Sequence, residues 1–318
     1  MSDHNQDVQV EPAEVLNRKL LDAINESSDG YLKSASEAAS NMIRRKLREN
    51  GFSRAILPYK QVSNEDLTYL PDTELPVIVE EMEPDSPGAK SISFNDTADT
   101  AFYRMDKFVV YFAKIVTKEF TKNVDELRTY KSDLRGVITD NSLKDMQTEE
   151  DGRFIKTIDT IVGTEGNVDG QSGFQQNFKI NGDITRDTYV EILSHLENRR
   201  LNNGVYLMNR KTAKKFLKWD RSEIGGDLAE RLFQEGLPAL SEGKVMGIRH
   251  IFTIKDELVA NQVVYQFAEP NYLGRAYILQ NVTMYVEKKK DILRFSAMEK
   301  IGITVANVAG AAKVRFAE

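Results

Sequence analysis

The four glycines between residues 163 and 173 are the best candidate in the sequence for phosphate chemistry. Gly163, Gly166, Gly170 and Gly173 recur at intervals of three or four residues. A P-loop, however, ends in Gly-Lys-Ser/Thr, and a dinucleotide-binding fingerprint lies between a strand and a helix. This stretch meets neither requirement, so it predicts a flexible connecting loop and not a nucleotide site.

The residues that nucleophilic or zinc chemistry needs are also missing. The sequence has no cysteine, which removes thiol nucleophiles, thiolate ligands and disulfides. It has no Gly-x-Ser-x-Gly elbow to expose a serine, and His4, His195 and His250 lie far apart without zinc-ligand spacing. We therefore expect no catalytic residues, no metal and no cofactor, in a protein that is not an enzyme. The alternative from another class is an uncharacterised cytoplasmic enzyme with a polar pocket within residues 185–282.

Four carboxylates gather in a stretch with helical periodicity, namely Asp145, Glu149, Glu150 and Asp151. Asp145 and Glu149 are four residues apart, so they would share a helix face and could hold a hydrated divalent cation. The favoured interpretation is a solvated acidic face, which is what a run of charges on a helix usually indicates.

A second acidic cluster lies beside a predicted hairpin tip and consists of Glu80, Glu81, Glu83 and Asp85. Two interpretations are open. The cluster pairs with a basic patch on a neighbouring subunit, or its charges keep an edge strand from aggregating.

Two basic clusters are the complementary candidates for contacts between subunits. One lies between two predicted strands, where it forms a polar turn or contacts those acids, and consists of Lys288, Lys289 and Lys290. The other ends a predicted helix and consists of Arg44, Arg45, Lys46 and Arg48. Basic residues there compensate the helix dipole. The alternative is an arm whose basic face meets DNA or an acidic partner.

Length and charge narrow the class of protein further. A chain of 318 residues can bury one large core or two linked subdomains. Its net charge of −6 argues against a protein whose main task is to grip nucleic-acid phosphates. The amino terminus is polar and acidic, and nowhere does the sequence show the roughly 18 consecutive apolar residues that a membrane-spanning helix needs. We therefore expect neither secretion nor a membrane partner.

An extended hairpin is the most informative element that the sequence predicts. Residues 75–83 are rich in β-forming types, residues 84–90 contain proline and glycine, and alternation returns at residues 91–94. Each arm would be roughly 30 Å long. The edges of such a ribbon invite pairing, so we expect it to reach onto a neighbouring subunit; the alternative is a hairpin that lies flat on its own domain.

The remaining periodicities predict an α+β protein. We expect one long strand over residues 102–120 and, after a shorter helical stretch from 124, a long helix that begins near 142 and ends at Gly163. A loop over 163–184 follows. The expected helices are then 185–201, 210–219 and 226–234, and the expected strands are 205–208, 245–253, 263–267, 276–288, 293–305 and 312–316.

Several segments of the last third resemble, in order and spacing, the major capsid proteins of tailed bacteriophages (Caudoviricetes). They are residues 206–209 in a strand that leads into a helix, residues 243–250 in a second strand, Arg294 in a third, and residues 302–307 near the carboxyl end. The lambdoid-type capsid fold of this family is similar to that of encapsulins and of the herpesvirus capsid floor.

The resemblance implies a fold and its division into parts. An amino-terminal arm would take residues 1–51 and an extended β-hairpin loop region residues 52–100. A peripheral domain would take 101–184 and 283–318, with its long spine helix at about 142–162, and an axial domain would take 185–282.

The resemblance also implies a function. The chain would be a structural protein that assembles with itself into the hexamers and pentamers of an icosahedral phage head, enclosing double-stranded DNA without sequence-specific binding. A separate scaffolding protein, a portal and a decoration protein would be its partners, and the capsid would be assembled in the host bacterial cytoplasm. Some relatives join subunits by a lysine–asparagine bond, but the lysine, asparagine and glutamate that it needs have no matching positions in this sequence, so the resemblance predicts nothing about cross-linking. An encapsulin-like nanocompartment around a protein cargo is the alternative within the same fold.

Overall fold

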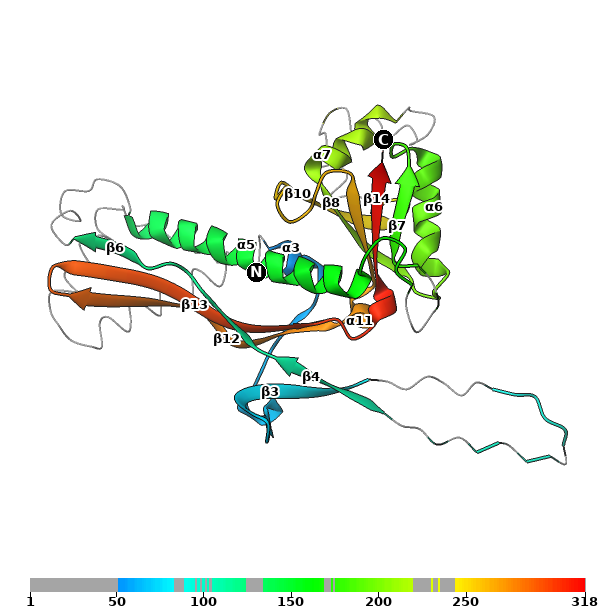
Figure 1. Cartoon of the computed structure of the whole chain (residues 1–318), viewed down its shortest axis with the longest axis horizontal. Coiled ribbons are helices and arrows are strands. Elements are labelled where there is room, and N and C mark those ends of the chain that lie inside the picture. The colour runs from blue at the N-terminus through cyan, green and yellow to red at the C-terminus, as the bar shows by residue number, and fades with distance from the viewer. Residues whose placement is uncertain are drawn as a thin grey trace, which may run out of the picture.

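A computed structural model describes residues 51–82, 89–94, 96–97, 99–100, 102, 105–123, 134–168, 173, 175–219, 230, 234 and 244–317. These residues form an α+β structure of three sheets, two of which pack against one long helix (Figure 1). The predicted arm and the predicted helices near 124 and 226 lie outside them, apart from single residues.

The largest sheet, here the axial sheet, contains six strands in the described part of the chain. In spatial order they are β7 (Asn177–Asn181), β14 (Ala311–Ala317), β11 (Val263–Ala268), β8 (Asn203–Asn209), β10 (Ile248–Thr253) and β9 (Lys244–Val245). On one face lie α6 (Arg186–Glu197), α7 (Arg210–Ala213) and the 3₁₀ helix η2 (Lys214–Lys218), which share a core with that face.

The other face of the axial sheet is covered by part of α5 (Leu134–Val162), a helix of 29 residues. At about 1.5 Å per residue it is about 43 Å long. Phe154 and Ile158 pack against the axial sheet, whereas Leu143 and Met146 pack against a second sheet. One rigid helix therefore links the two regions.

The second sheet, here the peripheral sheet, is built on the long antiparallel pair β12 (Arg275–Lys289) and β13 (Ile292–Thr304). β1 (Tyr59–Gln61) pairs in parallel with β12, while β5 (Ala113–Val116) and β6 (Phe120–Asn123) pair with successive parts of β13. The predicted turn between β12 and β13 is confirmed at Lys290 and Asp291, where Lys290 takes the left-handed backbone (φ 57°) that a tight turn requires.

The third sheet, here the loop sheet, consists of β2 (Thr68–Leu70), β3 (Thr73–Met82) and β4 (Asp106–Tyr111). β3 confirms the first predicted arm of the hairpin, but the predicted second arm at 91–94 is wrong. β3 pairs with β4, from Val77 opposite Tyr111 to Met82 opposite Asp106. β4 contributes Val110 to a core with Val62 and Tyr277, whereas residues 91–94 are exposed and lie outside any strand.

The single long strand expected over 102–120 is also wrong, because the chain changes sheet within it. β4 belongs to the loop sheet, and after Phe112 the strands β5 and β6 belong to the peripheral sheet. At Thr117, between β5 and β6, the backbone N–H donates to Ala297 O (2.9 Å) and the hydroxyl accepts from Ala297 N (2.9 Å). Uniform β-propensity could not reveal that its parts have different partners.

Three further boundaries differ from the sequence predictions. α5 begins at Leu134 and runs through 141–142, where a start was expected, because packing at Leu143 and Met146 outweighs the weak helix propensity there. The expected loop over 163–184 contains β7, which pairs in parallel with β14. The expected strand over 245–253 is two strands, β9 and β10, separated by a tight turn with positive φ at Met246 (49°) and Gly247 (84°).

The other predicted elements of the axial region are confirmed as α6, β8, β11 and β14, and the predicted 210–219 helix is α7 continued by η2. Sheet membership groups the chain differently from the domain boundaries that the resemblance implies. β7 and β14 fall within the segments assigned to the peripheral domain, yet both are strands of the axial sheet. The chain thus enters the axial region at β7, leaves it through β12 and β13, and returns to it with β14.

Candidate assembly surfaces and their anchors

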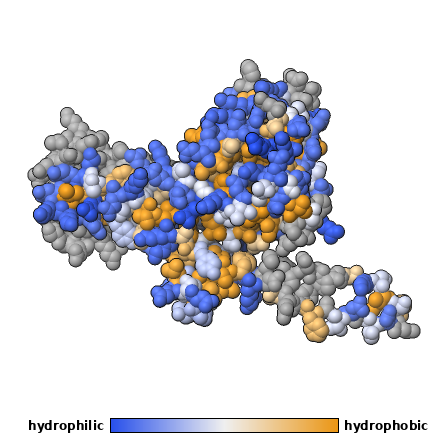
Figure 2. Space-filling model, in the orientation of Figure 1, coloured by the Kyte–Doolittle hydropathy of each residue, from blue (hydrophilic) through white to orange (hydrophobic). Residues whose placement is uncertain are grey.

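The described residues between β3 and β4 (89–94, 96–97, 99–100, 102 and 105), here the projecting segment, extend away from the rest of the molecule (Figure 1). The side chains of Phe94 and Phe102 are fully exposed, and those of Ile92 and Met105 are about half exposed, at 48% and 53%. Figure 2 shows apolar side chains on this part of the surface. Several large apolar side chains on one projecting element indicate a surface that is buried against another molecule.

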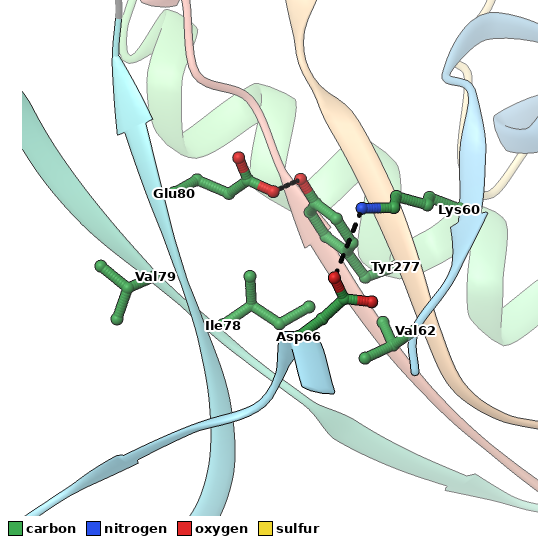
Figure 3. A pocket seen from close by; sticks show the side chains of 7 residues that line it. All are labelled: Lys60, Val62, Asp66, Ile78, Val79, Glu80 and Tyr277. Carbon is green, nitrogen blue, oxygen red and sulfur yellow. Dashed lines mark hydrogen bonds and ion pairs between the residues drawn. The ribbon is translucent and has the colours of Figure 1, made fainter. Parts of the chain in front are cut away.

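The base of the projecting segment is anchored to the peripheral sheet. Ile78 and Val110 face inward from β3 and β4 and pack with Val62 and Tyr277. The hydroxyl of Tyr277 donates a hydrogen bond to the carboxylate of Glu80 across this junction (Figure 3). Burial, together with the charge of Glu80, raises the pKa of Tyr277, so the hydroxyl stays protonated and remains a donor.

A small pocket of about 110 Å³ lies beside this hydrogen bond at the junction (Figure 3). Lys60 Nζ lies 3.8 Å from Asp66 Oδ1 at its rim, an exposed ion pair that contributes little to stability. The pocket is lined by Lys60, Val62, Asp66, Ile78, Val79, Glu80 and Tyr277. Its size and lining suit a joint between two sheets, since it is far smaller than a typical ligand site.

A buried charged cluster anchors the first described residues of the chain. Arg54 lies in α3 (Phe52–Ile56) and its guanidinium contacts Glu150 of α5 (Nε–Oε1 2.8 Å) and Glu299 of β13 (Nη2–Oε2 3.4 Å). Both carboxylates are fully buried. Glu150 Oε2 and Glu299 Oε1 have no hydrogen-bond partner among the described residues. Two buried carboxyl groups therefore share one guanidinium.

This arrangement determines the protonation of the cluster. Burial and the nearby charge of Glu150 raise the pKa of Glu299 to about 8. Burial also raises the pKa of Glu150, against the attraction of Arg54. Both carboxyl groups therefore hold a proton more readily than an exposed glutamate does, and Glu299, with its pKa of about 8, is mostly protonated at neutral pH.

A second buried ion pair continues the same anchor. Asp151 of α5 accepts a hydrogen bond from the backbone N–H of Ser53 (3.0 Å) and lies 2.6 Å from Lys255 Nζ. The Lys255 ammonium lies 5.6 Å from the centre of the Phe52 ring, a cation–π contact. α3 is thus tied to α5 through both its backbone and its side chains.

The solvated acidic face predicted for α5 is therefore wrong for Glu150 and Asp151, which are buried, although Asp145 and Glu149 are exposed. Glu149 pairs with Arg153 (3.1 Å) on the helix surface. No three His, Cys, Asp or Glu side chains among the described residues are grouped as a metal site would require. The helical spacing contained the missed signal, since position 150 lies on the same apolar stripe as Leu143, Met146 and Phe154.

The predicted contact residues between subunits that the structure describes lie in two separate places. Glu80 bonds Tyr277 within the subunit, and Glu81 pairs with Lys107 across β3 and β4 (2.9 Å). The residues at the turn of β12 and β13 are exposed at the end opposite to the projecting segment (Figure 1); these are Lys288, Lys289 and Lys290. The remaining candidates, Glu83, Asp85, Arg44, Arg45, Lys46 and Arg48, lie outside the described residues.

The described histidines belong to the packing of the axial sheet. His195 stacks on Phe178 with ring centres 3.7 Å apart, and His250 bonds the hydroxyl of Tyr189 (2.8 Å). Burial lowers the pKa of both imidazoles to about 4, so both are neutral at pH 7. Trp219 packs against Tyr189 in this cluster and donates its indole N–H to Ile184 O (3.0 Å).

No helix within the described residues is both long and apolar enough to span a bilayer. The described residues of the glycine stretch adopt turn conformations, with φ of 68° at Gly163, 85° at Gly166 and 71° at Gly173.

Solved structures with a similar arrangement of sheets and helices include proteins of phage capsids. The chain is similar to a protein of the mature capsid of bacteriophage PhiM1 (10% identity, TM-score 0.57), with 85% of this chain and 88% of that chain covered. It is similar to the capsid of a native GTA particle (15%, TM-score 0.56, 83% and 89% covered) and to the virus-like particle from Pyrococcus furiosus (16%, TM-score 0.51, 87% and 96% covered). No protein-family model and no curated protein matches the sequence. The chain therefore has the α+β fold of phage capsid proteins, as its sequence motifs indicate.

Proposed function

We propose that this protein is the major capsid protein of a tailed bacteriophage and that it assembles with itself into the hexamers and pentamers of an icosahedral head. The observation that carries the proposal is the projecting segment, with Phe94 and Phe102 fully exposed at the end of an anchored ribbon. In a monomer this apolar surface stays in contact with water and does not stabilise the fold. A neighbouring subunit that covers it gains burial at about 25 cal/mol per Å² of apolar surface.

In this proposal each subunit lays its projecting segment on the peripheral sheet of the next subunit. The predicted acidic cluster beside this segment would then approach Lys288, Lys289 and Lys290 of that neighbour. These lysines lie at the end of the molecule opposite to the projecting segment (Figure 1), so the segment of one copy can reach them on another. Such contacts are heterologous, and they close into rings when the rotation between neighbours fits.

The assembled shell would enclose double-stranded DNA without reading its sequence. A chain with a net charge of −6 is suited to surrounding DNA and not to gripping it. A separate scaffolding protein, a portal and a decoration protein are the proposed partners, and no catalytic activity is proposed. The mature location would be the virion capsid, after assembly in the cytoplasm of the bacterial host.

Sedimentation velocity of the purified chain, alone and with its scaffolding protein, tests the proposal. We expect rings or closed shells, seen by negative-stain microscopy in the fastest fraction. The matched variant replaces residues 89–102 with a Gly-Ser linker, which leaves β3 and β4 in place, and it should remain folded without forming shells. A single 36.1 kDa species under both conditions would contradict the proposal, and so would normal shells from the variant.

An encapsulin-like nanocompartment is the second candidate, because the fold is also that of the Pyrococcus furiosus virus-like particle. The two candidates differ in what the shell contains. A protein cargo that copurifies with shells in fixed proportion would favour the nanocompartment, whereas shells that form empty or with a scaffolding protein favour the phage head.

A further inference from the structure

Two charged stripes lie on the same face of the axial sheet. On α6 the exposed side chains along one side include three acids, Asp187, Glu191 and Glu197, which flank Val190, 47% exposed; Arg186 is also exposed there, at the first residue of the helix. On α7 and η2 they are basic, at Arg210, Lys214 and Lys218, and they flank Leu217, which is 45% exposed. None of these charged groups forms an ion pair with another described residue. Each stripe thus carries three charges of one sign around one exposed apolar side chain, with Arg186 as an opposite charge at the start of α6.

The neighbouring charges on the same helices behave differently. Lys211 pairs with Asp256, and Lys215 pairs with Asp183, so their charges are satisfied within the subunit. Pairing inside the chain therefore distinguishes two basic residues, Lys211 and Lys215, from the three that have no acidic partner among the described residues. This distinction is not visible in the sequence, where five basic residues occur between positions 210 and 218.

The two stripes lie toward opposite sides of the axial sheet. α6 contacts β14 and β8, and its residues Glu191 and His195 line a groove of about 530 Å³ beside the edge strand β7. α7 contacts β8 and β10, toward the other edge (Figure 1). A stripe on each flank is the arrangement that a ring of identical subunits requires, because every heterologous contact joins one flank of a copy to the opposite flank of the next.

The stripes also match in length. Residues 187–197 of α6 span about 15 Å at the rise of an α-helix. Residues 210–218 span about 14 Å, because the rise is about 1.5 Å per residue in α7 and about 2.0 Å in the 3₁₀ helix η2. Three acidic groups and three basic groups can therefore face each other over the same distance, with Val190 and Leu217 between them.

We infer that the acidic stripe of α6 in one copy docks on the basic stripe of α7 and η2 in the next copy around a ring. This inference rests on the proposed function and specifies the second subunit contact that the ring needs near its axis. Charge complementarity sets the register and the direction of such a contact. DNA is the other anion that a basic stripe could meet, but it would leave the acidic stripe without a role.

Charge reversal in two sets, followed by their combination, tests the inference. The first variant carries Asp187→Lys, Glu191→Lys and Glu197→Lys; the second carries Arg210→Glu, Lys214→Glu and Lys218→Glu. Each alone places like charges at the contact, so we expect at least a tenfold loss of rings and shells. The variant with all six substitutions restores opposite charges, and we expect its assembly to return to within about threefold of the unmodified chain.

The combined variant is its own control, because it contains every substitution that could damage folding. Equal assembly of the unmodified chain and of either triple variant would overturn the inference, as would a combined variant no better than the worse triple variant. Loss of DNA binding in the second variant with unchanged shells would assign the basic stripe to nucleic acid and also overturn it. If the unmodified chain forms no rings, the proposed function itself fails.

Discussion

The axial region and the projecting segment use the same kinds of apolar side chain in opposite ways. Around the axial sheet, helices on both faces bury Phe154, Phe216 and Phe267 almost completely. In the projecting segment Phe94 and Phe102 remain fully exposed. The comparison shows that the chain stabilises its own fold in one region and carries unburied apolar surface in another. We interpret the second region as surface that only assembly buries.

The largest difference in stability between the two regions is expected from a matched pair of phenylalanine substitutions. Phe154→Ala removes a fully buried ring that packs between Phe52 and Phe267, and it should lower the free energy of unfolding by about 3–5 kcal/mol. Phe94→Ala removes an exposed ring and should change that free energy by less than about 0.5 kcal/mol.

Urea unfolding of both variants under conditions that keep the protein monomeric measures these free energies. Phe94→Ala should strongly reduce shell formation although it leaves the fold and its stability almost unchanged. Equal destabilisation by the two substitutions would contradict the distinction between the regions.

An intermediate effect is expected at the buried cluster that joins α3, α5 and β13. Glu299 has its pKa raised from 4.5 to about 8, so the folded chain retains a proton that the unfolded chain has already released between these values. The contribution of Glu299 to stability is therefore greatest below pH 4.5 and falls as the pH rises toward 8. The slope contributed by one such proton is at most about 1.4 kcal/mol per pH unit.

Glu299→Gln keeps the shape of the side chain and removes the titration. We expect this variant to lose that part of the decline between pH 5 and pH 8, and to be more stable than the unmodified chain near pH 8. Urea unfolding at several pH values measures the effect. Parallel curves for the two proteins would show that Glu299 does not hold the proton.

The smallest effect is expected at the base of the projecting segment, where the loop sheet joins the peripheral sheet. Tyr277→Phe removes the hydrogen bond to Glu80 and should cost about 1 kcal/mol. Because this bond fixes the loop sheet on the peripheral sheet, we expect faster amide exchange in β3 and β4 and little change in β8 or β11. Hydrogen exchange read by mass spectrometry distinguishes the two. Uniformly faster exchange would show that Tyr277 supports the whole core and not the joint.

The parts of this fold that could be predicted from the sequence are those whose partners are close in the chain or whose periodicity is long. β12 and β13 are joined by a tight turn at Lys290, so the alternation of apolar and polar residues was sufficient to predict both strands and the turn between them. The end of α5 at Gly163 was equally clear, because glycine is the residue that most readily takes the left-handed backbone observed there. Strands that pair over long separations, such as β3 with β4 or β7 with β14, lacked any local signal of their partners.

The sequence by itself determined the class of protein: an α+β chain without cysteine, with an extended ribbon and the ordered motifs of a capsid protein. Only the tertiary structure decided which charges are buried. In the sequence Glu150 lies 96 residues from Arg54 and Glu299 lies 245 residues from it. Only folding brings these three residues together. A charge on a helix reads the same in the sequence whether it faces water or a partner, because its environment is made by segments distant in the chain.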